Sequence, residues 1–255
     1  IPSRLVGSEM CIRDSIETKE CIIQTIGQYI TNPNTIGNVI GLNGPPGTGK
    51  TTFVKNISTI LQRPVEIINL SGAQDVSYLE GHGFTYEGSK YGKILHTLIK
   101  HRTMNPIIFF DEVDKISKTD KGAELENLLI NIVDITQNNT FADKYFQEIS
   151  IDLSKILFIF SYNYSDEINP VLKDRIYEIN VEGYSYEEKI TLCHRHLIPN
   201  ILKSFSFEKN HIVFTDSAIK YIIDKYSNTD SGVRNLIKVI KNILSKIHII
   251  YITDN

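Results

Sequence analysis

The segment between residues 44 and 51 has the composition of a phosphate-binding loop. It reads Gly-Pro-Pro-Gly-Thr-Gly-Lys-Thr and directly follows the mostly apolar run 38–42. Its glycines let successive backbone N–H groups turn inward around phosphate oxygens, and a helix that follows would present the positive end of its dipole. The segment therefore predicts a nucleoside-triphosphate site, with a Gly-rich turn that binds nothing as the less favoured alternative.

Two side chains of this segment have distinct expected roles. Lys50 is expected to reach the β and γ phosphates, and the hydroxyl of Thr51 is expected to bind the Mg²⁺ that bridges them. The predicted nucleotide contacts are Gly44, Pro45, Pro46, Gly47, Thr48, Gly49, Lys50, Thr51 and Thr52.

Two carboxylates follow a second apolar run. Residues 106–110 are nearly all apolar, and Asp111 and Glu112 come next. A buried strand would place both at its tip, where Asp111 suits the metal and Glu112 suits the base that orients and polarises a water molecule. Ordinary acids at a strand end would look the same, but the phosphate loop upstream favours the catalytic interpretation.

Apolar strands and helical stretches alternate around these residues. Strands are predicted at 38–42, 65–70, 106–110, 156–160 and 176–181, and helices at 16–30, 50–61, 92–102 and 123–136. The alternation predicts an α/β fold, with a five-stranded parallel sheet between layers of helices. Ligands of such sheets bind outside the carboxyl ends of the strands, where the phosphate loop lies.

The sequence pattern changes near residue 183. Helical patterns cover 186–197, 216–226 and 232–250, and only 212–214 is strand-like. We therefore expect an α/β nucleotide-binding subdomain at 16–183 and a small, mainly helical subdomain at 184–255.

Residues 1–15 are left out of this division. The segment VGSEMCIRDS, at 6–15, resembles a translated sequencing adapter, and position 1 is not Met. We expect a non-native leader at 1–15 and a helical subdomain that is truncated at its end.

Composition limits the class of partner. The chain has 255 residues, 41% apolar side chains and a formal charge of −3 without a basic cluster, which makes nucleic acid an unfavoured partner. Cys11, Cys21 and Cys193 lack disulfide or zinc spacing, which favours a reducing compartment. No apolar run reaches the roughly 18 to 20 residues that span a bilayer, so no membrane partner is expected.

Several motifs together resemble the AAA+ ATPase family. They are GPPGTGKT at 44–51, IIFFDEVDK at 107–115 and SYN at 161–163. Four further segments are similar to the ATPase module of Lon proteases, at 80–94, 141–163, 169–199 and 231–236. This resemblance, which extends from residue 17 to the end of the chain, implies an AAA+ P-loop core with ATP and Mg²⁺ as its cofactors.

The resemblance implies roles for three further polar residues. Asn163 matches sensor 1, which helps to place the water, and Arg234 matches sensor 2, which reaches the nucleotide of its own subunit. Arg175 matches the arginine finger that reaches the γ-phosphate of a neighbouring subunit. A turn-forming Asn163, a helix-surface Arg234 and a local ion pair of Arg175 with Asp174 or Asp166 remain the alternatives. The implied catalytic set is Lys50, Glu112, Asn163 and Arg175.

The loop at 84–92 matches the pore loop with which the family grips unfolded polypeptide. Tyr86 stands in the aromatic position, but Glu87 stands where the family places an aliphatic residue. An acid presents a solvated charge where apolar contact is expected, although Tyr91 could compensate. A surface loop with incidental tyrosines is the alternative.

The implied function is that of a ring-forming motor, most simply a homohexamer, that hydrolyses ATP to unfold and thread protein substrates. Because a finger from a neighbour is worth roughly 10³ to 10⁵ in rate in known systems, hydrolysis should depend on assembly. We expect the serine peptidase activity of a Lon protease to lie outside this chain, in a further domain of the full-length protein. The expected location is cytoplasmic, with the mitochondrial matrix as the alternative.

Other functions remain open. One is a stand-alone protein remodeller without a peptidase, another a nucleic-acid-acting loader or helicase, and a third a scaffold that binds nucleotide without hydrolysis. Glu112 and Asn163 argue against the scaffold.

Overall fold

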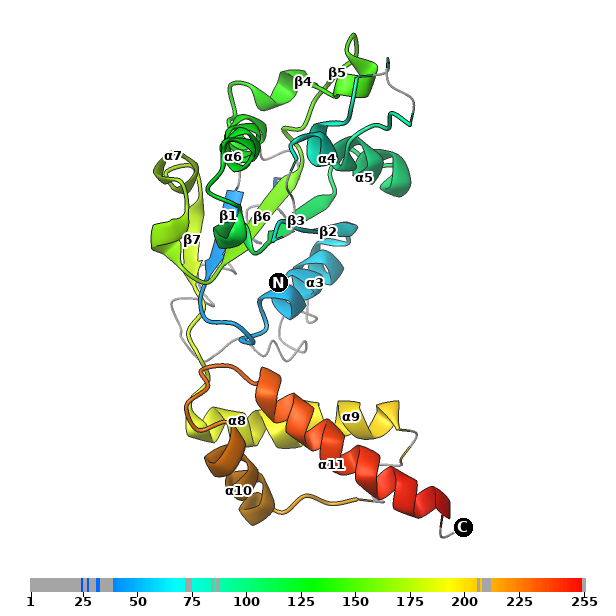
Figure 1. Cartoon of the computed structure of the whole chain (residues 1–255), viewed down its shortest axis with the longest axis vertical. Coiled ribbons are helices and arrows are strands. Elements are labelled where there is room, and N and C mark those ends of the chain that lie inside the picture. The colour runs from blue at the N-terminus through cyan, green and yellow to red at the C-terminus, as the bar shows by residue number, and fades with distance from the viewer. Residues whose placement is uncertain are drawn as a thin grey trace. The chain divides into compact units, whose positions relative to one another are not determined.

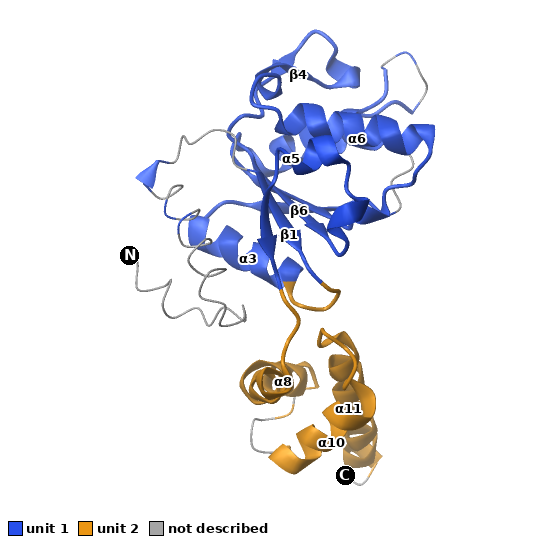
Figure 2. Cartoon of the chain, turned by 90° about the vertical axis from the view of Figure 1, so that its left-hand side faces the viewer, with its two compact units in different colours: residues 1–44, 50–181 blue, residues 45–49, 182–255 orange. Residues whose placement is uncertain are grey.

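The computed structural model describes residues 24, 27, 31–32, 39–71, 75–83, 85, 88–205, 207 and 212–253. They form two compact units (Figure 2). Unit 1 comprises residues 1–44 and 50–181, and unit 2 comprises residues 45–49 and 182–255. The helix predicted at 16–30 lies outside the described residues, apart from single positions.

Unit 1 is built on a five-stranded parallel sheet, which confirms the predicted α/β fold (Figure 1). The strands are β1 (Val39–Asn43), β2 (Val65–Asn69), β3 (Ile107–Asp111), β6 (Leu157–Tyr162) and β7 (Tyr177–Asn180). Their order across the sheet is β2-β3-β6-β1-β7. The carboxyl ends of β3, β6 and β1 are therefore neighbours.

Helices cover the sheet and bury both of its faces. The principal ones are α3 (Lys50–Leu61), α5 (Lys93–His101) and α6 (Asp120–Val133). Side chains of β3 alternate between two apolar clusters, with Ile108 and Phe110 in the cluster that α5 and α6 complete, and Ile107 and Phe109 in the cluster that α3 completes. Because successive side chains of a strand point to opposite faces, this alternation places one layer of helices on each side.

The remaining elements of unit 1 are short. They are α4 (Ser77–Glu80), η1 (Val113–Lys115), η2 (Asn138–Thr140), β4 (Phe141–Ala142), η3 (Lys144–Phe146), β5 (Ser150–Ile151), η4 (Ser165–Glu167) and α7 (Pro170–Lys173). Strands β4 and β5 form a separate antiparallel pair.

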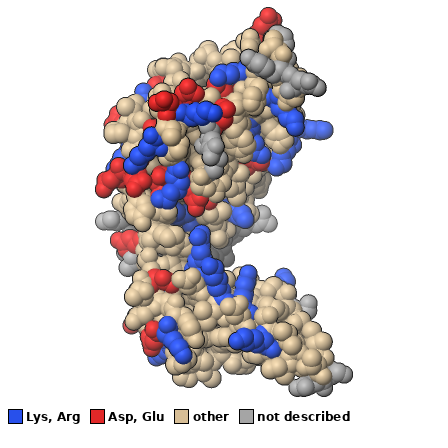
Figure 3. Space-filling model, in the orientation of Figure 1, with Lys and Arg blue, Asp and Glu red and all other residues tan. Residues whose placement is uncertain are grey.

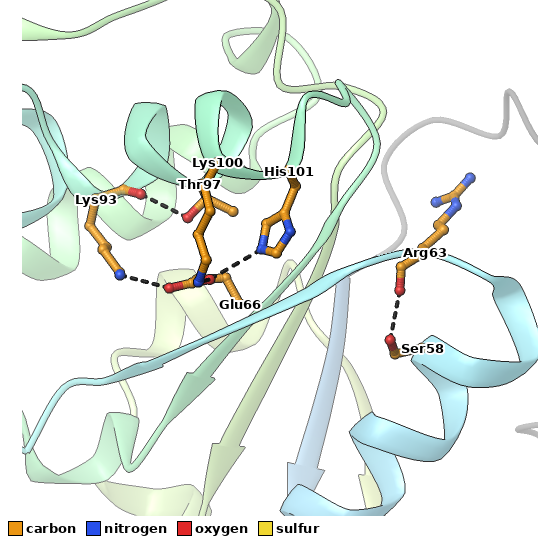
Figure 4. A network of polar contacts seen from close by, with 7 residues as sticks. All are labelled: Ser58, Arg63, Glu66, Lys93, Thr97, Lys100 and His101. Carbon is orange, nitrogen blue, oxygen red and sulfur yellow. Dashed lines mark hydrogen bonds and ion pairs between the residues drawn. The ribbon is translucent and has the colours of Figure 1, made fainter.

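A buried carboxylate ties the edge strand β2 to α5 (Figure 4). Glu66 is only 7% exposed, and its carboxylate pairs with Lys93 at 2.7 Å, Lys100 at 2.7 Å and His101 at 3.2 Å. Burial opposes ionisation of Glu66, but the hydrogen bonds from Lys100, Lys93 and His101 outweigh it and lower its pKa from 4.5 to about 2. The acid at this position is thus part of the packing between β2 and α5.

Unit 2 joins the loop residues 45–49 to a set of helices. These are α8 (Tyr186–Leu192), the π-helical turn η5 (Cys193–Leu197), α9 (Ile198–Ser204), α10 (Asp216–Tyr226) and α11 (Arg234–Thr253). Ser185 caps α8 in a reciprocal arrangement with Glu188. The buried Lys189 donates to the Ser227 carbonyl at 2.8 Å and to that of Asp230, just beyond the end of α10. This lysine holds the segment that leads into α11.

The strand-like run at 212–214 does not form a strand, so this prediction is wrong. Val213 is 78% exposed. The strand-favouring residues of the run at 212–214 do not form a strand by themselves, because a strand also requires hydrogen-bond partners for its backbone groups.

Surface charge and helix length agree with the composition. On the face of unit 1 that Figure 3 shows, Lys and Arg side chains are interspersed with Asp and Glu side chains. Among the described residues, no helix is long and apolar enough to cross a membrane.

Candidate nucleotide site

The carboxyl edge of the sheet brings together four predicted site residues of unit 1, which are Lys50, Asp111, Glu112 and Asn163. The loop that begins at Gly44 follows β1, Asp111 ends β3, and Asn163 follows β6. These three strands are adjacent in the sheet, so residues far apart in the sequence emerge at one edge.

Lys50 and Asn163 are in direct contact. Lys50 is 8% exposed, and its Nζ donates to Asn163 Oδ1 at 2.8 Å and to the carbonyl of Gly44. The first residue of α3 and the residue after β6 are thus joined by a side-chain hydrogen bond. A buried cation at this edge provides the charge that a phosphate group requires.

Asp111 has a buried partner on the neighbouring strand, Ser161. The Ser161 hydroxyl donates to Asp111 Oδ1 and accepts from the backbone N–H of Glu112 at 3.4 Å. Ser161 is 1% exposed. The sequence prediction missed this residue, although a hydroxyl within the otherwise apolar run at 156–162 was a usable signal.

Glu112 is held by both its backbone and its side chain. Its backbone lies in the left-handed region, with φ 61° and ψ 47°, which is uncommon for a residue with a Cβ. Its Oε2 accepts from Asn69 Nδ2 at 3.3 Å, and Asn69 lies opposite Asp111 in the register of β2 with β3. Sequence reasoning also missed Asn69, whose one signal was an amide at the end of a predicted strand.

Arg175 does not pair with Asp174 or Asp166 as the local alternative supposed. Its Nη2 donates to Asp134 Oδ2 at 2.9 Å, its Nε donates to the same oxygen at 3.3 Å, and its Nη1 donates to the carbonyl of Val171 at 3.0 Å. Asp134 follows α6, so the arginine is tied to a helix distant in the sequence.

Unit 2 contains the middle of the phosphate loop together with the start of α11. Gly47 and Gly49 have φ of +81° and +88°, values that glycine adopts without strain. The backbone N–H of Val233 donates to the Gly47 carbonyl at 3.2 Å, and the Tyr184 hydroxyl donates to the Thr48 carbonyl at 3.1 Å. The loop carbonyls are thus bonded outward, which suits a loop whose N–H groups face a ligand.

Arg234 lies beside this loop. A Cβ added to Gly47 would come within 3.2 Å of the Arg234 Cβ, and one added to Gly232 would lie 2.2 Å from the Pro46 carbonyl oxygen. Gly232 therefore permits the close approach that brings Arg234 to the loop. Within unit 2, the predicted sensor 2 residue and the predicted phosphate loop are neighbours.

The donor set fits a magnesium nucleotide. Phosphate oxygens suit the Lys50 amine and the N–H groups of a loop with glycines at positive φ. The Thr51 hydroxyl and the Asp111 carboxylate are hard oxygen ligands, and Mg²⁺ is commonly bound by one or two carboxylates plus substrate phosphates. Thr52 follows in α3.

The predicted pore-loop residues Tyr86 and Glu87 lie outside the described residues. The base of their loop is described, and there the His82 N–H donates to the Lys90 carbonyl at 3.1 Å. The Gly92 N–H donates to Asp143 Oδ2 at 2.7 Å, and Asp143 is fully buried. Hydrogen bonds therefore hold the residues on both sides of the loop.

Comparison with known families agrees with this geometry. Residues 40–184 match the ATPase family associated with various cellular activities (AAA), and residues 203–255 match the Lon protease AAA+ ATPase lid domain. The chain belongs to the AAA family of ATPases, membership of which implies ATP binding and hydrolysis.

Individual relatives are more specific. The chain is 42% identical over 233 residues to a Lon protease homolog of Acanthamoeba polyphaga mimivirus, covering 91% of this chain and 23% of that protein. It is 39% identical over 230 residues to a mitochondrial Lon protease homolog of Scheffersomyces stipitis, covering 90% and 21%. It is also 39% identical over 220 residues to a Lon protease of Cytophaga hutchinsonii, covering 86% and 27%. The chain thus spans about a quarter of the length of these relatives.

Proposed function

We propose that this chain is the ATP-hydrolysing motor of a Lon-like, ATP-dependent protease, which unfolds and threads protein substrates. The observation that carries the proposal is the meeting of Lys50, Asn163, Asp111 and Glu112 at one edge of the sheet, in a chain with a Lon-type lid. The protease activity itself is proposed for the full-length protein, because the relatives that match are Lon proteases.

Each residue has a proposed role in hydrolysis. Lys50 neutralises charge on the β and γ phosphates, and Thr51 and Asp111 hold Mg²⁺, which supplies further neutralisation when bound. Glu112 orients and polarises the attacking water, and Asn163 helps to place that water. Phosphoryl transfer requires alignment and charge stabilisation rather than covalent chemistry, so these polar groups suffice for it.

Two arginines complete the proposed site. Arg234 contacts the nucleotide of its own subunit, which its position beside the phosphate loop supports. Arg175 stabilises the γ-phosphate at the site of a neighbouring copy, and this role requires a ring, which we propose is a homohexamer. A finger of this kind is worth roughly 10³ to 10⁵ in rate in known systems. An isolated subunit should therefore be nearly inactive.

Glu112→Gln tests the hydrolytic assignment. The variant should bind a fluorescent ATP analogue as the parent does, because the phosphate loop is unchanged, while turnover falls by roughly 10² to 10⁴ with loss of the base. The exposed Glu124→Gln is the matched control and should hydrolyse at the parental rate. Parental turnover in Glu112→Gln would remove Glu112 from the mechanism.

The partner is tested separately. Tyr86→Ala should leave ATP hydrolysis unchanged and slow the unfolding of a tagged protein substrate, and unchanged unfolding would refute the pore-loop assignment. Stimulation of hydrolysis by DNA, weakened by salt, would instead favour a nucleic-acid-acting protein. Localisation of the full-length protein to the cytoplasm or the mitochondrial matrix would agree with this function.

A further inference from the structure

Asp134 presents a carboxylate in a fixed orientation at the end of α6. Its backbone N–H donates to the Ile130 carbonyl at 3.1 Å. Its Oδ1 accepts from the Thr136 N–H at 2.9 Å and from the Thr136 hydroxyl at 2.6 Å. One oxygen is thus held by a local turn, and Oδ2 is left for another donor.

That donor is the side edge of the Arg175 guanidinium. Nε and Nη2 both donate to Asp134 Oδ2, while Nη1 donates to the Val171 carbonyl. A guanidinium has five N–H donors in one plane, so three are engaged and one remains on each of Nη1 and Nη2. These two have no acceptor within the described ranges. Phosphate oxygens are acceptors that suit such guanidinium N–H groups.

The helix that precedes Arg175 is attached to the same support. Asn169 caps α7 by accepting from the Val171 N–H at 2.9 Å, and its Nδ2 donates to Glu126 Oε2 at 2.9 Å. Glu126 lies within α6 (Asp120–Val133). Helix α7 lies beside α6 (Figure 1), and these hydrogen bonds fix both the backbone near Arg175 and its side chain relative to α6.

Charge at this pair is stable across the range in which hydrolysis would be measured. Hydrogen bonds from Thr136 and then from Arg175 lower the pKa of Asp134 from 3.8 to about 2, so the carboxylate stays ionised at neutral pH. Arg175 is 32% exposed and Asp134 is 16% exposed. The pair is neither fully buried nor free in solvent.

We propose that Asp134 is a positioning residue that holds the Arg175 guanidinium in one orientation and leaves an N–H on each of its terminal nitrogens for a phosphate of nucleotide bound to a second copy of this chain. The inference rests on the trans role of Arg175 proposed above. A long arginine side chain loses rotamer entropy when it is fixed, and a side chain already held by Asp134 does not lose it again in the transition state.

The Asp134 carboxylate also has an effect that opposes the action of Arg175 on a phosphate. A carboxylate next to Arg175 reduces the field that a phosphate would experience, so Asp134 could instead restrain the arginine. The two effects predict opposite changes. If orientation dominates, removal of Asp134 lowers turnover, whereas if neutralisation dominates, removal raises it. Because two N–H groups stay available while the pair is intact, we expect orientation to dominate.

The first test compares Asp134→Ala with Arg175→Ala and the double variant. Asp134→Ala should lower kcat by about tenfold to a hundredfold, the usual cost of a misplaced catalytic group, and leave KM and the affinity for a fluorescent ATP analogue within about twofold. The double variant should be no slower than Arg175→Ala, because Asp134 acts only through Arg175. Additive losses, or a kcat that stays at or rises above the parental value in Asp134→Ala, would overturn the inference.

Asp75→Ala is a matched control. Asp75 Oδ1 accepts from the Ser77 N–H at 2.9 Å and from the Ser77 hydroxyl at 2.7 Å, the same local turn without the arginine. Both Asp→Ala variants should keep a similar thermal midpoint, since partly exposed ion pairs contribute little to stability. Only Asp134→Ala should lose turnover. An equal loss in both variants would indicate a general effect of removing such turns.

The second test asks whether the effect acts between subunits. Glu112→Gln subunits are expected to be inactive but carry an intact Asp134 and Arg175, so mixing them with Asp134→Ala subunits should restore hydrolysis in the latter. Arg175→Ala subunits should be rescued in the same way. Rescue of Arg175→Ala but not of Asp134→Ala would overturn the positioning role and leave the proposed function standing. If Arg175→Ala hydrolyses at the parental rate, the finger itself is wrong, and the inference fails with it.

Discussion

Replacing Glu66 by Gln should remove a substantial electrostatic contribution to the stability of unit 1. A carboxyl whose pKa falls from 4.5 to about 2 on folding contributes about 3 kcal/mol at neutral pH. Glu66 is buried, but the side chain of Lys100 is 50% exposed, so solvent screens part of that interaction. We therefore expect Glu66→Gln to lower the free energy of unfolding by about 2 to 3 kcal/mol.

The dependence on pH follows from the direction of the shift. The unfolded chain takes up a proton at Glu66 near pH 4.5, whereas the folded protein resists protonation down to about pH 2. The contribution of Glu66 is therefore complete above the unfolded pKa and is lost as the pH falls through the folded pKa. The stability difference between the parent and Glu66→Gln should shrink steadily over this range.

Urea denaturation, followed by far-UV circular dichroism, measures both quantities. Unfolding free energies should be compared near neutral pH and again at about pH 3, where roughly half of the difference should have disappeared. The exposed Glu124→Gln is the control and should stay within about 0.5 kcal/mol of the parent. A Glu66→Gln variant as stable as the parent near pH 7, or a difference that does not change with pH, would refute the reasoning.

Three further changes test the supports of the site. Ser161→Ala removes the hydroxyl that donates to Asp111 and should raise the Mg²⁺ concentration for half-maximal hydrolysis by about tenfold; an unchanged Mg²⁺ titration would contradict this. Gly232→Ala would place a Cβ 2.2 Å from the Pro46 carbonyl oxygen, so binding of a fluorescent ATP analogue should weaken by at least about tenfold, and parental affinity would show that the loop position is unimportant. Asp143→Ala leaves the buried Gly92 N–H, at the base of the predicted pore loop, and the part-buried Tyr145 N–H unsatisfied and should cost about 1 to 3 kcal/mol in urea denaturation, a prediction that parental stability would refute.

The parallel sheet could be predicted because its strands are nearly continuous apolar runs. Strand β3 is buried from Ile107 to Phe110, and α3 occupies the predicted range 50–61. Such runs reflect burial on both faces and do not depend on which strands are neighbours. The phosphate loop could be predicted from the sequence because the expected phosphate contacts come from one continuous segment of backbone.

The partners of the predicted catalytic side chains could not be predicted in the same way. Asn69 and Ser161 contact Glu112 and Asp111 only because β2 and β6 flank β3, and strand order is not encoded by local periodicity. The local alternative for Arg175 was an ion pair with Asp174 or Asp166, a few residues away. Its partner is instead Asp134, which directly follows α6. The strand prediction at 212–214 failed for the converse reason: its residues favour a strand, but no strand pairs with them among the residues that the structure describes.

The charges of these partners differ in a way that bears on function. Three of the contacts are to neutral groups: Asn163 on Lys50, Ser161 on Asp111 and Asn69 on Glu112. A neutral partner orients a charged group without cancelling its charge, so the amine can still bind phosphate and the carboxylates can still serve a metal and a water.

Arg175 is the exception, because its partner is the ionised Asp134. For a cationic residue that binds phosphate within its own site, an adjacent carboxylate would weaken its interaction with the phosphate. For a residue proposed to act on a neighbouring copy, the balance differs, since the guanidinium must keep its orientation on a partly exposed surface before any phosphate is near. An ionised partner at Nε and Nη2 holds it there and leaves one N–H on each terminal nitrogen available. The ionised partner of Arg175 is therefore consistent with the trans role proposed for it.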